Sequence, residues 1–98
     1  YSIKDMKFVA WDPVKNEKLK RERNISFEDV LDVLLENGAV GRFPHPNQKR
    51  YPNQQVFVIV MKDYAYVVPF VEDDEKTFLK TIFPSRKYTR VYVEKGGS

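Results

Sequence analysis

The chain has 98 residues, 42% of them hydrophobic and 14% aromatic, which is enough for one compact domain and too little for two. With one histidine, no cysteine and no calcium-loop spacing, it lacks the residues for disulfides, thiol catalysis, iron–sulfur clusters and cysteine-ligated zinc, so we expect no metal and no cofactor. The net charge is +3, no apolar run approaches the roughly 18 residues of a membrane span, and the start lacks the layout of a signal peptide, so we expect a cytoplasmic protein.

The N-terminal third predicts a strand and then a helix. Residues 6–11 (MKFVAW) are typical of a short strand. Asp12 followed by Pro13 is a helix N-cap with proline in the first turn. The helix that follows is polar and basic, and we expect Asn24 to end it.

A second helix has the clearest pattern in the chain. Ser26 and Asp29 have the spacing of a capping box, and Asn37 with Gly38 provides a C-cap. Between them, apolar residues recur at helical spacing. This pattern predicts an inward face made of Phe27, Val30, Leu31, Leu34 and Leu35, and an acidic outward face made of Glu28, Asp29, Asp32 and Glu36.

A proline- and asparagine-rich stretch separates the helices from the later strands. Apart from a short strand at 40–43, we expect it to be an exposed loop, and a loop of this length in so small a domain usually has a function. Residues 55–61 and 64–71 then predict a hairpin of central strands with a tight turn. Pro69 predicts a bulge or a free edge in the second strand, because proline cannot donate to the ladder.

The C-terminal part predicts one more long strand, over residues 76–83, and a short terminal helix that begins at Pro84. The late strands are joined by short turns and are therefore expected to be antiparallel. We predict an α+β fold: a small antiparallel sheet of four to five strands, two N-terminal helices on one face and a short C-terminal helix. We expect one domain over residues 1–95, with 96–98 a tag remnant or a disordered tail.

The charges fall in blocks. Residues 15–23 carry five basic and two acidic groups, residues 26–36 carry four acidic groups and no basic one, and the acidic run 72–75 precedes five basic groups in 76–90. Such blocks can form a basic face for phosphates opposed by an acidic face, and they are equally typical of ordinary solvated surfaces.

The common catalytic motifs are absent, including GxSxG, HExxH, Walker and GxGxxG patterns. The chain offers instead arginine, lysine and tyrosine near a single histidine, an inventory that suits RNA, whose own 2′-hydroxyl can cleave the strand without metal. His45 is a candidate general acid or base, or a solvated loop residue, and Arg86 is a candidate for stabilising the phosphorane or for a structural ion pair. We expect the strand aromatics to pack in the core or on the sheet, with room for one to be exposed for binding. The candidate RNA-binding residues are Lys20, Arg21, Lys49, Arg50, Tyr51, Lys87 and Arg90.

Three segments together resemble the BrnT toxin family: 11–16 (WDPVKN), 24–29 (NISFED) and 81–90 (TIFPSRKYTR). The similarity extends in order over residues 8–90. It implies a RelE-like fold and a metal-independent endoribonuclease, the toxin of a type II toxin-antitoxin pair. It also implies a hetero-oligomer with a DNA-binding BrnA antitoxin, and the lack of a long apolar run leads us to expect no membrane partner.

The chain departs from the family at two places. The family commonly has Lys-His-Gly where this chain has Glu22-Arg23-Asn24, so Arg23 enters the candidate catalytic set as a phosphate binder in place of that histidine. In the terminal segment, Arg86, Lys87 and Thr89 match the family, whereas Pro84, Ser85 and Tyr88 differ from it. Two other hypotheses therefore stay open: a non-catalytic RNA- or protein-binding module of the same fold, and an interaction protein whose helix faces meet a partner. For a toxin, we expect the antitoxin to cover Lys18, Lys20, Arg21, Arg50 and Arg86.

Overall fold

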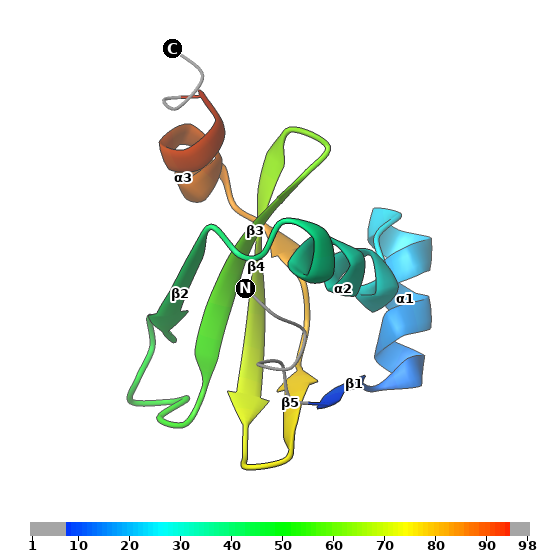
Figure 1. Cartoon of the computed structure of the whole chain (residues 1–98), viewed down its shortest axis with the longest axis vertical. Helices are drawn as coiled ribbons and strands as arrows, with labels where there is room; N and C mark the ends of the chain where they lie inside the picture. Colours follow the sequence, from blue (N-terminus) through cyan, green and yellow to red (C-terminus); the bar gives the residue numbers. More distant parts are fainter. Residues whose placement is uncertain (1–7, 95–98) are drawn as a thin grey trace.

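A hairpin with a two-residue turn forms the centre of the sheet in the computed structural model, which describes residues 8–94 (Figure 1). Its strands are β3 (Gln55–Met61) and β4 (Tyr64–Glu72). The turn residues Lys62 and Asp63 have positive φ angles of 53° and 62°, the geometry whose twist matches that of the flanking strands. The hairpin predicted from the sequence is confirmed.

The sheet is mixed, with the strand order β1-β5-β4-β3-β2 and β6 paired to β4. β1 runs parallel to β5, whereas all the other pairs are antiparallel. The prediction of a purely antiparallel sheet is therefore wrong, because the two helices after β1 carry the chain from one edge of the sheet to the other. The strands outside the central hairpin are β1 (Phe8–Trp11), β2 (Gly41–Pro44), β5 (Lys76–Leu79) and β6 (Phe83–Pro84).

The segment 76–83 was expected to be one strand, and in the structure it is interrupted between β5 and β6. The interruption lies beside Pro69, whose carbonyl accepts a hydrogen bond from Lys80 N–H at 2.8 Å. Because proline has no N–H to offer on that side, a regular ladder cannot continue there. The irregularity expected at Pro69 takes the form of this interruption, which divides the predicted long strand; neither a bulge nor a free edge is recorded at Pro69 in the described residues.

Both N-terminal helices begin and end at the positions that the capping residues in the sequence predict. Asp12 caps α1 (Pro13–Arg23) by accepting from Val14 N–H at 2.9 Å, and Asn24 ends it with φ 54°. In α2 (Phe27–Glu36) both bonds of the Ser26–Asp29 capping box are present. One expected inward residue is wrong: Leu35 is 41% exposed, because it lies at the edge of the helix face that meets the sheet.

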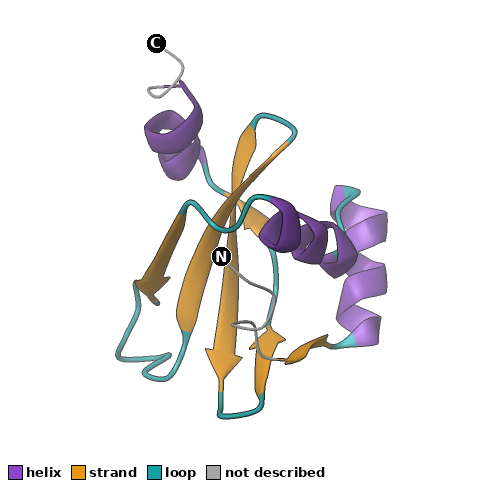
Figure 2. Cartoon of the chain, viewed as in Figure 1, coloured by secondary structure: helices purple, strands orange, loops and turns teal. Residues whose placement is uncertain are grey.

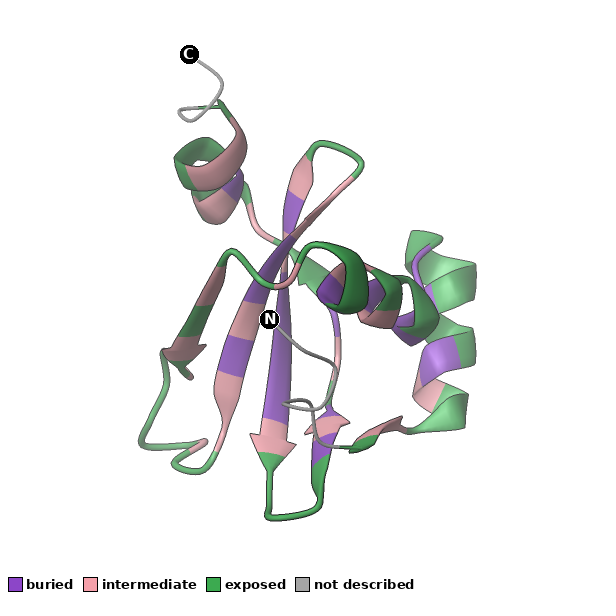
Figure 3. Cartoon of the chain, viewed as in Figure 1, coloured by how far each residue is buried: buried purple, intermediate pink, exposed green. Residues whose placement is uncertain are grey.

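The core lies on both faces of the sheet, along β3 and β4 (Figure 3). α1 and α2 cover one face, as predicted. α3 (Arg86–Thr89) and the π-helical turn η2 (Arg90–Glu94) lie on the other face (Figure 2). Pro84 does not open the terminal helix; it lies in β6, and Ser85 is the N-cap. Residues 6 and 7 of the first predicted strand and the tail at 96–98 lie outside the described residues.

Candidate functional site

The candidate site residues lie in three separate regions. The C-terminal basic segment (Arg86, Lys87 and Arg90) belongs to α3 and η2. The loop cluster (His45, Lys49, Arg50 and Tyr51) lies between β2 and β3, and the α1 cluster (Lys20, Arg21 and Arg23) occupies the last turn of α1.

The C-terminal basic segment is attached to the start of β4 through Thr89. The buried Thr89 hydroxyl accepts from Ala65 N–H at 2.9 Å and donates to the Ser85 carbonyl at 2.7 Å. Tyr88 stacks on Phe43 of β2 with a centroid distance of 6.0 Å. These contacts fix the backbone of α3 while its cations stay exposed.

None of the three cations of the C-terminal basic segment forms an ion pair with a carboxylate in residues 8–94. Lys87 Nζ lies 5.6 Å from the Tyr88 ring centroid, and Arg86 and Arg90 are exposed. Three cations within five residues of a rigid segment favour the binding of a polyanion.

Thr89→Val should lower the free energy of unfolding by about 1–3 kcal/mol, because the valine keeps the shape of the side chain and leaves the buried Ala65 N–H without its acceptor. Urea denaturation measures the change, and hydrogen exchange at the Ala65 amide should be faster. Thr89→Ser keeps the hydroxyl and is the matched control. An unchanged stability for the valine variant would contradict the anchoring role of Thr89.

In the loop cluster, the His45 side chain contacts neighbouring residues of the same loop. Its Nδ1 accepts from Asn47 N–H at 3.0 Å, and its ring lies 4.5 Å from the Tyr51 ring. An Nδ1 that accepts a hydrogen bond belongs to a neutral ring with its proton on Nε2. Arg50 lies over the Tyr51 ring at 5.6 Å, and Lys49 is exposed. His45 therefore has a structural role in shaping this loop, and its Nε2–H is the atom left to meet a ligand.

The structure does not bring His45 and Arg86 together. His45 N–H bonds to the Gln54 carbonyl next to the end of β4, whereas Ser85 N–H bonds to the Ala65 carbonyl at the start of β4. At about 3.3 Å per strand residue, these two points are about 17–20 Å apart along the sheet. A single catalytic centre does not contain both residues in this conformation.

Two of the three cations of the α1 cluster, Arg23 and Lys20, have hydrogen-bond partners within the chain. Arg23 Nη1 donates to the Ile82 carbonyl at 2.6 Å and so connects α1 to the segment between β5 and β6. Lys20 pairs with Glu17 at 3.1 Å, and this hydrogen bond is the main cause of the raised pKa of Lys20. Arg21 is the exposed cation of this group for which the structure records no contact.

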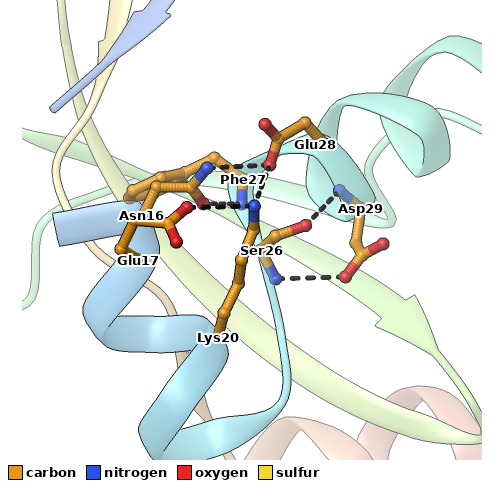
Figure 4. A network of polar contacts seen from close by, with 7 residues as sticks. All are labelled: Asn16, Glu17, Lys20, Ser26, Phe27, Glu28 and Asp29. Carbon is orange, nitrogen blue, oxygen red and sulfur yellow. Dashed lines mark hydrogen bonds and ion pairs between the residues drawn. The ribbon is translucent and has the colours of Figure 1, made fainter. Parts of the chain in front are cut away.

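The residues of the two N-terminal segments that resemble BrnT connect α1 to α2 (Figure 4). The buried Asn16 accepts from Phe27 N–H and donates to the Glu28 carboxylate, each at 2.8 Å. The bond from Asn16 is the main reason that the pKa of Glu28 is lowered. Trp11 stacks on Phe27 with a centroid distance of 5.7 Å. These motif residues stabilise the fold, so their similarity to the family bears on architecture and not on chemistry.

A cavity of about 210 Å³ lies between α2 and the hairpin turn, and the sequence did not indicate it. Its carboxylates, Asp29 and Asp32, come from α2, whereas Lys62 and Tyr66 come from the hairpin. No local signal predicts that these two elements are adjacent. Two carboxylates beside one lysine make this cavity unfavourable for phosphates.

The part of the chain that the structure describes holds neither a cluster of metal-ligating side chains nor a helix able to cross a membrane. Residues 8–94 contain no group of three or more His, Cys, Asp or Glu side chains placed to hold a metal ion. None of their helices combines the length and apolarity that crossing a bilayer requires.

Comparison with protein-family models, with curated proteins and with solved structures found no match.

Proposed function

We propose that the chain is an endoribonuclease toxin of the BrnT type with a RelE-like fold, which cleaves RNA without metal and is neutralised by a DNA-binding antitoxin. The observation that supports this proposal best is the C-terminal basic segment. Arg86, Lys87 and Arg90 extend from an anchored helix, free of described acidic partners, and they lie in the segment that resembles the end of BrnT sequences.

The proposed reaction uses the 2′-hydroxyl of the substrate. The 2′ oxygen attacks the adjacent phosphorus and loses its proton to a base, the bond from phosphorus to the 5′ oxygen breaks, and the 5′ oxygen takes a proton from an acid. The products are a 2′,3′-cyclic phosphate and a 5′-hydroxyl. Arg86 stabilises the charge of the phosphorane, and Lys87 and Arg90 hold neighbouring phosphates. Because His45 lies about 17–20 Å away along the sheet, proton transfer at this centre falls to other groups.

One set of observations favours a second function, a non-catalytic RNA-binding module of the same fold. The single histidine is separated from Arg86, and Arg23, which replaces the family histidine, is bonded to the Ile82 carbonyl. A chain with phosphate-binding groups and no proton-transfer group beside them binds RNA without cleaving it.

Incubating the purified chain with single-stranded RNA in EDTA separates the two functions. Cleavage with 2′,3′-cyclic phosphate ends supports the toxin. Intact RNA together with salt-dependent binding supports the binding module, because phosphate contacts weaken as salt rises. RNA that is neither bound nor cleaved contradicts both proposals.

For the antitoxin, we propose an acidic segment that lies over the C-terminal basic segment. The five basic residues expected to be covered are divided among α1, the loop between β2 and β3, and α3. These regions are separate in the fold, and the partner either wraps around the domain or covers the C-terminal basic segment alone.

A further inference from the structure

Part of one sheet face has none of the helices of residues 8–94 over it. Cross-strand partners share a face, so Phe78 points to the same side as Val71 and Ala10, which is the side on which α3 lies. α3 and η2 pack on the residues of β3 and the first half of β4, away from β1 and β5 (Figure 1). The outer half of this face is therefore uncovered by the helices of residues 8–94.

The uncovered face carries aromatic rings and lysines. Phe78 is half-buried, and Lys80 Nζ lies 5.5 Å from the centroid of its ring. Phe83 of β6 is opposite Val67, on the same face, and is 38% exposed. Phe8 at the edge is 74% exposed, and Lys76 beside it is exposed as well. Exposed rings interleaved with cations are the features that bind single-stranded nucleic acid.

We propose that this face binds single-stranded RNA, with one base stacked on Phe78, another on Phe83, and a phosphate of the segment between them held by Lys80. The proposal rests on the ribonuclease function proposed above and adds the surface that holds the substrate beside Arg86. The β4 partners of the two rings, Val71 and Val67, are four residues apart, or about 13 Å. That span holds about four nucleotides at the roughly 3.4 Å rise of a stacked strand, and fewer in an extended strand.

The charges at the two ends of this face indicate towards which end a bound RNA continues. The acidic residues 73–75 lie in the turn before β5, at the end away from β6, and repel phosphates there. Towards the other end, Lys80 and Phe83 lead along the chain to Arg86. RNA bound on the two rings therefore continues towards the C-terminal basic segment, the proposed site of cleavage.

The test is binding of a 2′-O-methylated oligouridine, which cannot be cleaved, followed by fluorescence anisotropy. Phe78→Leu and Phe83→Leu keep an apolar side chain and remove the ring, and each should weaken binding about 5- to 100-fold, the effect of losing one stacked base. Lys80→Gln should weaken binding and reduce its dependence on salt. The matched controls are Tyr64→Leu, on the opposite face of β4, and Lys62→Gln in the hairpin turn; both should bind as the unmodified chain does.

Several outcomes would overturn the proposal. If both leucine variants bind normally while Arg86→Ala binds weakly, RNA binds the chain elsewhere and the ribonuclease proposal stands. If the unmodified chain does not bind RNA, both proposals are wrong. If Phe83→Leu instead converts a dimer to a monomer in sedimentation, the face binds a second copy. Should a variant fail to fold, ultraviolet crosslinking of 5-bromouridine RNA to the unmodified chain decides, because the crosslinks must map to Phe78 or Phe83.

Discussion

Arg86→Ala should lower the rate of RNA cleavage about 100-fold or more, the scale of a lost transition-state contact, and leave the fold intact. The expectation of an intact fold follows from the structure. Arg86 is exposed, its side chain has no recorded contact with a described residue, and α3 is held by Ser85 and Thr89. Single-turnover cleavage and urea denaturation, measured on the same preparation, separate the two effects.

Arg86→Lys should restore only part of the rate, because lysine lacks the two-pronged donor geometry that fits a phosphorane. His45→Ala provides the comparison, since His45 lies in the loop cluster far from α3, and its loss should be smaller. If a folded Arg86→Ala protein cleaves RNA normally, the catalytic site lies elsewhere, in the α1 cluster or in the loop cluster. Loss of a limb in the pH-rate profile of His45→Ala would favour the loop cluster.

The parts of the fold that were predicted correctly are those decided by neighbours in the chain. Asp12, Ser26 and Asn24 mark helix ends because their side chains or φ angles satisfy backbone groups within a few residues. The turn at Lys62 and Asp63 is equally local. These signals need no knowledge of the remaining structure, so the sequence is sufficient to read them.

The parts that were missed depend on partners far along the chain. The break between β5 and β6 requires that Pro69 be opposite it, and the parallel pairing of β1 requires that two helices cross the sheet. The separation of His45 from Arg86 has the same origin, because both follow a strand in the sequence and only the register places them at opposite ends of β4. Composition alone groups basic residues that the fold distributes over three regions.

Phe83 illustrates the limit for the candidate site. An alternating apolar strand predicts a buried ring, whereas the Phe83 ring is 38% exposed, and Tyr88 and Tyr92 pack on residues of β3 and the first half of β4. Whether an apolar strand residue is core or binding surface depends on which element covers that face, and no residue near Phe83 carries that information.

The second large effect that we expect is on stability, and it distinguishes two residues of α2, Phe27 and Leu35, that helical spacing places on the same inward face. Phe27→Ala should lower the free energy of unfolding by about 3–5 kcal/mol, because Phe27 is fully buried, stacks on Trp11 and leaves a cavity when truncated. Leu35→Ala should lower it by less than about 1 kcal/mol, because Leu35 is 41% exposed and leaves little cavity. Helical periodicity assigns both residues to the inward face, so the difference between the variants measures what the structure adds.

Urea denaturation followed by circular dichroism gives both values. If Phe27→Ala does not fold, Phe27→Leu keeps most of the buried volume and should give an intermediate loss that is still larger than that of Leu35→Ala. Equal losses for the Phe27 and Leu35 variants would mean that α2 is rotated about its axis relative to the sheet. Such a rotation would also break the bond from Phe27 N–H to Asn16, so the connection between α1 and α2 depends on the same result.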